Sequence, residues 1–101
     1  MDIGEILIGM GLTPNVAGFR EMIAAVEEYR KNYSVQQKEV CDTLAEKLGT
    51  KSANVYRTLH YAVNKLDTET DFYRAYIGNR RVPLAEFTSI LAYRTREKDN
   101  D

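Results

Sequence analysis

Apolar side chains recur at every third or fourth position along almost the whole chain. The clearest stripe runs from Phe19 to Tyr29 and passes through Met22, Ile23 and Val26. This spacing places the apolar side chains on one face of an α-helix, whereas a half-buried strand would alternate apolar and polar residues. No segment shows convincing alternation. The sequence therefore predicts an all-α domain of about six helices.

Residues that commonly begin and end helices divide the chain into segments. The expected starts are Asp2 followed by Glu5, Thr13 followed by Pro14, Ser34 followed by Gln37, and Pro83. The expected ends are Gly11, Gly49 and Gly78, because glycine readily adopts the left-handed conformation found at helix C-termini. Between residues 67 and 78 we expect a short helix that directs Phe72, Tyr76 and Ile77 inward.

The length of 101 residues fits one domain, which we expect to span residues 1–96. Residues 97–101 offer no apolar anchor and are expected to fray. The chain lacks an apolar run of about 20 residues, so no membrane span is expected. Asp2 and Glu5 stand where a signal peptide would carry positive charge, and the single cysteine, Cys41, cannot form an internal disulfide. These features predict a cytoplasmic protein.

Two of the expected helices stand close together in the sequence, separated by only a few residues around Gly49. We expect the first over about residues 35–48 and the second over about residues 52–66. Ala45 is small enough for the second helix to approach the first, Gly49 permits a positive φ in the turn, and Val55 fills the angle between the helices. This spacing predicts a helix-turn-helix, with residues 52–66 as the recognition helix.

The second of these helices contains no acidic residue. The chain has 15 acidic and 14 basic residues, yet no Asp or Glu occurs from Gly49 to Leu66. Carboxylates on a DNA-binding face would oppose the attraction of phosphates, so their absence fits a helix that lies in the major groove. A stretch without acidic residues also arises by chance, and the pattern therefore gains weight only because it coincides with the helix-turn-helix spacing.

Helical geometry predicts which side chains of this segment would face DNA. If Val55, Leu59 and Val63 point to the core, then Asn54, Arg57 and Tyr61 point away from it. Arginine reads guanine and asparagine reads adenine in the major groove. The predicted DNA-binding residues are Lys51, Ser52, Asn54, Tyr56, Arg57, His60, Tyr61 and Lys65, and Arg80 and Arg81 are predicted to contact either phosphate or a partner protein.

The sequence resembles the C-terminal DNA-binding effector domain of the sporulation-initiating response regulator (the stage-zero sporulation transcription factor) of endospore-forming Firmicutes. The resemblance is carried by "GLTPNVAGF", by "VCDTLAEKLGTKSANVYRTLHYAVNKL" and by "RRVPLAEFTSILAYRTR". It covers most of residues 5–96 at low but distributed identity.

That resemblance implies a six-helix transcription factor that binds short DNA boxes, often as tandem dimers, and contacts RNA polymerase. Arg57 matches a base-contacting arginine of the family, whereas Asn54 replaces a basic residue and Tyr56 an acidic one. His60 and Tyr61 replace an Arg-His pair, so we expect a different operator. The family's phosphoacceptor receiver domain is expected to be absent, either because this is a stand-alone relative or because the sequence is part of a longer protein.

Other classes of function are less well supported by the sequence. One histidine and one cysteine on different helices make no nucleophile–base pair, and no metal-ligand spacing or glycine-rich phosphate loop occurs, so we expect no enzyme activity, cofactor or metal. The main alternative is a protein–protein interaction module that keeps the fold without binding DNA. The pI near 5.8 and the seven tyrosines favour that alternative. If the protein instead binds DNA, the expected partners are double-stranded DNA, RNA polymerase and a second copy of the chain on DNA.

Overall fold

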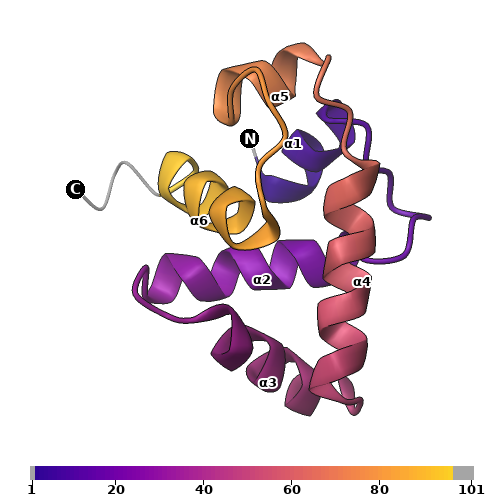
Figure 1. Cartoon of the computed structure of the whole chain (residues 1–101), viewed down its shortest axis with the longest axis vertical. Coiled ribbons are helices and arrows are strands. Elements are labelled where there is room, and N and C mark those ends of the chain that lie inside the picture. The colour runs from indigo at the N-terminus through magenta and orange to yellow at the C-terminus, as the bar shows by residue number, and fades with distance from the viewer. Residues whose placement is uncertain (1, 97–101) are drawn as a thin grey trace.

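The computed structural model describes residues 2–96, and within them the chain forms six α-helices and no strand (Figure 1). The helices are α1 (Ile3–Gly9), α2 (Phe19–Lys31), α3 (Gln37–Leu48), α4 (Ser52–Lys65), α5 (Asp71–Tyr76) and α6 (Leu84–Arg94). The predicted all-α class is confirmed. None of the described helices is both long enough and apolar enough to cross a membrane. The predicted fraying of residues 97–101 lies outside the described part of the chain.

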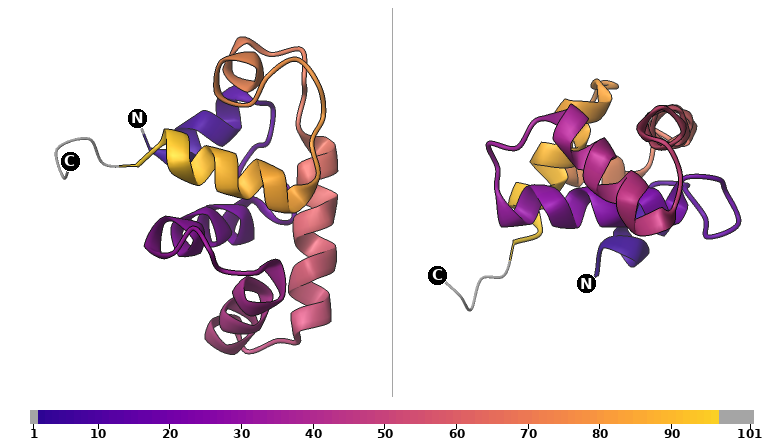
Figure 2. Two further views of the ribbon diagram at one scale, coloured as in Figure 1. Left: turned by 60° about the vertical axis from the view of Figure 1, so that its left-hand side comes forward. Right: turned by 90° about the horizontal axis from the view of Figure 1, so that it is seen from below.

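Helix α2 occupies the centre of the fold and contacts four of the other helices. It packs along α6 and also contacts α1, α3 and α4, while α5 contacts α1 and α6 (Figures 1 and 2). The side chains of Met22, Val26, Phe87 and Leu91 are fully buried where α2 meets α6 and its neighbours. Burial of apolar area of this kind is the main source of stability in a small domain. The apolar stripes predicted from periodicity therefore meet in one continuous core.

The starts of two helices differ from the sequence prediction. Helix α2 begins at Phe19 and not at Pro14, because Gly18 adopts φ +97° and breaks the helical path, while the Thr13 hydroxyl donates to the side chain of Asn15. Helix α3 begins at Gln37, and its capping box is formed by Gln36 and Glu39. The predicted box of Ser34 with Gln37 is wrong because the Ser34 N–H donates to the Asn32 side chain in a preceding turn.

Other predicted boundaries agree with the structure. The Asp2 side chain accepts a hydrogen bond from the Glu5 N–H at 2.8 Å and caps α1. Gly49 ends α3 with φ +68°, and Gly11 and Gly78 also have positive φ beyond their helices. Pro83 is the residue just before α6, so that helix begins one position later than expected. Such one-residue shifts are normal at helix ends.

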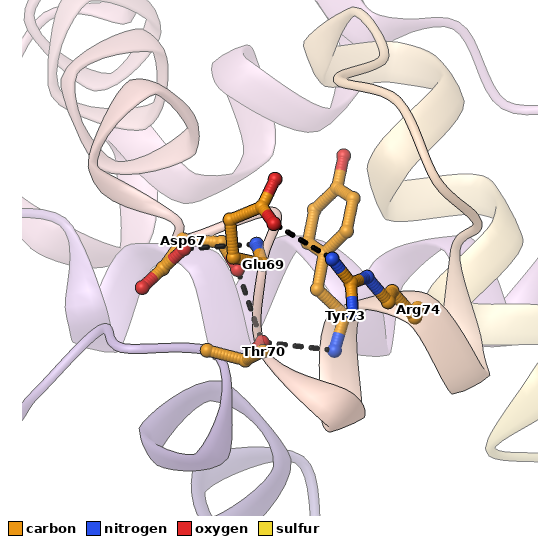
Figure 3. Close-up of polar contacts among 5 residues, drawn as sticks. All are labelled: Asp67, Glu69, Thr70, Tyr73 and Arg74. Atoms are coloured by element: carbon orange, nitrogen blue, oxygen red, sulfur yellow. Dashed lines mark hydrogen bonds and ion pairs between the residues drawn. The ribbon is translucent and has the colours of Figure 1, made fainter.

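Helix α5 is held at its start by local hydrogen bonds (Figure 3). The Thr70 hydroxyl accepts from the Tyr73 N–H at 3.1 Å, and the Asp67 carboxylate accepts from the Glu69 N–H at 2.8 Å. Arg74 forms an exposed ion pair with Glu69 at 2.7 Å. The fully buried side chain of this helix is Tyr73, whose hydroxyl donates to the Arg80 carbonyl. The residues expected to point inward, Phe72, Tyr76 and Ile77, are only half-buried.

Candidate nucleic-acid interface

Helices α3 and α4 are joined by a turn of residues 49–51 and pack against each other (Figure 1). The left-handed conformation of Gly49 reverses the chain, and the Thr50 N–H donates to the Ala45 carbonyl at 3.0 Å. Ala45 and Val55 are both buried, at 5% and 2% exposure. Ala45, Gly49 and Val55 thus take the positions in the two helices and their turn that their spacing predicts. The helices begin and end within two residues of the expected bounds, 35–48 and 52–66.

One side of α4 is buried and the other is open to solvent. The buried side carries Val55, Leu59, Ala62 and Val63, with Leu66 just beyond the helix end. Of the eight predicted DNA-binding residues, Lys51, Asn54, Tyr56, Arg57, Tyr61 and Lys65 are exposed, and Ser52 and His60 are half-buried. Viewed from below in Figure 2, α4 is nearly end-on and lies at the edge of the molecule. The assignment of the two faces of this helix from its periodicity is therefore confirmed.

The side chains on the open face differ in how far they are already engaged. Arg57 forms no hydrogen bond or ion pair within residues 2–96, so its guanidinium is available to a ligand. The Asn54 amide donates to the Thr50 hydroxyl at 3.0 Å. The Tyr56 and His60 rings meet edge to face with centroids 4.3 Å apart. Lys65 Nζ lies 5.1 Å from the centroid of the Tyr61 ring, within the range of a cation–π contact.

Arg57 lies on a ridge between two grooves. The larger groove, about 850 Å³, runs between α3 and α4, and its lining includes Lys38, Asp42, Ser52, Tyr56 and His60. The smaller one, about 250 Å³, separates α4 from Ala17 in the segment that precedes α2. Arg57 lines both grooves. The open face of α4 is thus a ridge with a hollow on each side.

Asp42 is a charged residue of this surface that the sequence analysis did not identify. Its carboxylate accepts hydrogen bonds from the Ser52 hydroxyl, at the first residue of α4, and from Lys38 Nζ at 3.2 Å. The hydrogen bond from Ser52, with that from Lys38, lowers the pKa of Asp42 below its usual value. The spacing of Lys38 and Asp42 in one helix could have suggested their ion pair, but the contact with Ser52 depends on how α3 and α4 pack.

The two arginines of the α5–α6 connector differ in their surroundings. The Arg81 guanidinium donates to the carbonyl oxygens of Val63 and Leu66, both at 2.7 Å, and so caps the C-terminal end of α4. Arg80 is exposed and lies 3.5 Å from Glu86. Both residues were predicted to contact phosphate or a partner. The structure gives Arg81 an internal contact instead, and its main donors are already occupied.

Cys41 is buried on α3, and His60 is half-buried on α4. Burial raises the pKa of the Cys41 thiol, and the nearby Asp42 charge raises it further, so the nucleophilic thiolate is disfavoured. Among the described residues, no three His, Cys, Asp or Glu side chains are grouped so as to hold a metal ion. The α3–α4 surface presents cationic, amide, hydroxyl and aromatic groups to a ligand.

Comparison with protein-family models, with curated proteins and with solved structures gives no match for this chain.

Proposed function

We propose that this protein is a sequence-specific DNA-binding transcriptional regulator that places α4 in the major groove. The observation that carries the proposal is the open, acid-free face of α4, with the unpaired Arg57 on its ridge. An α-helix fits the width of the major groove, where each base pair presents a distinct pattern of donors and acceptors. The α3–α4 pair would serve as a helix-turn-helix, with α3 as the scaffold helix and α4 as the recognition helix.

The side chains on this face suit the two kinds of contact that a reader of DNA makes. Arg57 has the paired donors that match guanine, and Asn54 can pair with adenine once its amide leaves the Thr50 hydroxyl. Lys51, Ser52 and Lys65, which carry positive charge or a hydroxyl, would contact phosphates. The rings of Tyr56 and Tyr61, each 48% exposed, would pack against the sugar-phosphate backbone. His60, on the same face, would also contact the DNA.

The modest charge of the chain favours a dimer on DNA. The formal net charge is −1, so a single copy would neutralise few phosphates. Two copies would present two α4 helices to two half-sites and double the phosphate contacts. The resemblance to the sporulation response-regulator effector domain supports this arrangement, and it also suggests RNA polymerase as a partner and the bacterial cytoplasm as the location. Arg80, unlike Arg81, remains available for a phosphate or a partner protein.

Binding of a fluorescent duplex tests the proposal. We expect selection from a random duplex library to yield a consensus with two half-sites, and affinity for that site to fall steeply as salt increases, with a log–log slope of about 0.9 per neutralised phosphate. Arg57→Ala should lose about 1–3 kcal/mol of binding free energy on the selected site, because a bidentate base contact is removed. Far-UV circular dichroism should show an unchanged helix content.

Arg74→Ala is the matched control for that variant. Arg74 is an exposed arginine on α5, paired with Glu69 and absent from both grooves that flank α4 (Figure 3). Arg74→Ala removes the same charge as Arg57→Ala, but at a position outside the proposed interface. We therefore expect nearly unchanged binding. Equal losses in the two variants would show that Arg57 acts only through net charge and would contradict its role in reading a base.

A protein–protein interaction module is the second candidate function, and a separate aromatic cluster favours it. Tyr93 and Tyr33, 54% and 44% exposed, meet edge to face with centroids 5.9 Å apart, and the Arg96 guanidinium stacks 3.9 Å from the Tyr93 ring centroid. Exposed tyrosine and arginine are enriched where proteins bind each other. A folded protein that binds no duplex at low salt would favour this function over DNA binding.

A further inference from the structure

Asp42 stands out because its carboxylate lies beside the surface proposed to meet a polyanion. One carboxylate oxygen accepts from the Ser52 hydroxyl on α4 and the other accepts from the Lys38 ammonium on α3. All three residues line the groove between these helices, together with Arg57. A negative charge at this position should weaken binding of DNA, since it repels phosphates over a distance of a few ångströms. Its presence therefore needs a physical explanation.

The contacts of Asp42 are those that a phosphodiester would make. A phosphate in DNA has two anionic oxygens, and it is commonly bound by a hydroxyl and an ammonium group together. Ser52 and Lys38 supply these two groups from different helices, and the carboxylate holds them close together. The start of α4 has no side-chain cap, because Lys51 at the cap position accepts no hydrogen bond from the backbone there, and the Asp42 carboxylate lies beside this helix end through its contact with the Ser52 hydroxyl. Asp42 thus provides the negative charge that favours a helix N-terminus.

We propose that Asp42 is an internal substitute for a DNA phosphate, which a phosphodiester displaces when α4 enters the major groove. Ser52 and Lys38 then bind the phosphate in place of the carboxylate. The carboxylate competes with every phosphate, whatever the base sequence, so its effect is to lower affinity for random DNA. The inference rests on the proposed function and adds to it Lys38, a phosphate-binding residue outside the predicted set.

The test is a double-variant cycle on the full chain, read out with a fluorescent random-sequence duplex. Asp42→Asn removes the charge at nearly constant shape, and Asp42 is exposed, so the fold should persist. We expect about three- to tenfold tighter binding at low salt, because a phosphate no longer has to displace the carboxylate from Ser52 and Lys38. Lys38→Gln should cost more affinity in the Asp42→Asn background than in the unmodified protein. Inorganic phosphate should compete more strongly with the duplex in Asp42→Asn.

Glu27→Gln is the matched control because it removes one carboxylate from the exposed side of α2, in a pocket whose lining includes residues of α1, α2 and the segment after α6 but none of α4. It should change binding much less than Asp42→Asn does. Equal gains in the two variants, or a gain in Asp42→Asn that Lys38→Gln leaves intact, would overturn the inference while DNA binding itself stands. If neither the unmodified protein nor Asp42→Asn binds any duplex, the proposed function fails and this inference fails with it.

Discussion

Arg57 and Arg81 are both exposed arginines near α4, yet their guanidinium groups have different surroundings. Arg57 lies on the open face without a partner, whereas Arg81 reaches back to two carbonyl oxygens at the end of the same helix. The sequence identifies both as exposed cations, and periodicity assigns Arg57 correctly to the open face. It gives no sign of the Arg81 contact, because Val63 and Arg81 lie 18 positions apart and meet only when the chain is folded.

Gly18 and Gly49 illustrate two different reasons why a position requires glycine: a positive φ alone, and a positive φ together with a close neighbour. Both have positive φ, but an added Cβ at Gly18 would lie 2.7 Å from the Thr58 carbonyl oxygen, whereas at Gly49 it would meet nothing within 4 Å. Gly49→Ala should cost about 1–2 kcal/mol of unfolding free energy, the cost of a left-handed L-residue. Gly18→Ala should cost about 2–5 kcal/mol, because the chain must also move away from α4.

Chemical denaturation of the two glycine variants measures this difference. Equal losses of unfolding free energy would show that the segment before α2 does not press on α4 as closely as the structure has it. The comparison also matters for the interface, because this segment forms the wall of the smaller groove beside Arg57.

At the scale of the elements, the segments that became helices are those with apolar periodicity, and the errors lie at their starts. Thr13 and Ser34 are residue types that favour the start of a helix, but each hydrogen-bonds within a turn and leaves the start to a later residue. The α3–α4 pair was better predicted, since Ala45, Gly49 and Val55 constrain the turn from both sides. The local sequence thus predicts that a helix is present more reliably than it predicts the residue at which the helix begins.

The end of α4 gives a prediction at this scale. Arg81→Ala removes two hydrogen bonds to carbonyls of α4 and a positive charge from its C-terminal end, so it should lower the unfolding free energy by about 1–2 kcal/mol. Arg80→Ala, its matched control, removes an exposed pair with Glu86 and a long, exposed hydrogen bond to the Arg81 carbonyl, both at 3.5 Å, and should cost less than about 0.5 kcal/mol. Thermal denaturation of both variants measures the two losses. A smaller loss for Arg81→Ala than for Arg80→Ala would contradict the capping role.

At the scale of the whole molecule, the position of α2 decides which surfaces remain open. Helix α2 contacts α1, α3, α4 and α6, and the buried apolar side chains of these helices form one core cluster. Helix α4 lies across the N-terminal end of α2, which covers its apolar face and leaves the face with Arg57 uncovered. The candidate interface therefore depends on the packing of the whole domain and not on α3 and α4 alone.

Val55→Asp tests that dependence. Val55 is 2% exposed on α4, and an unpaired carboxylate buried there should cost several kcal/mol, a large part of the total stability of about 5–15 kcal/mol that a domain has. We expect the whole domain to unfold, which would abolish the cooperative thermal transition and the helical circular dichroism signal. Tyr56→Asp, one residue further and exposed, should keep both. A folded Val55→Asp variant would show that the faces of α4 are assigned wrongly.

Residue spacing along the chain was enough to derive its helical class, the bounds of the helices to within about five residues, and the apolar face of α4. These properties follow from the order of residues within a few turns of helix, so they can be derived from spacing alone. Three contacts of α4 could be seen only in the folded molecule: Asp42 joins Ser52, at the start of α4, to Lys38 on α3; Arg81 caps the end of α4; and Gly18 lies against its side. The physical reason is that most of these contacts join side chains and backbone atoms from different elements, and their partners are set by packing across the core.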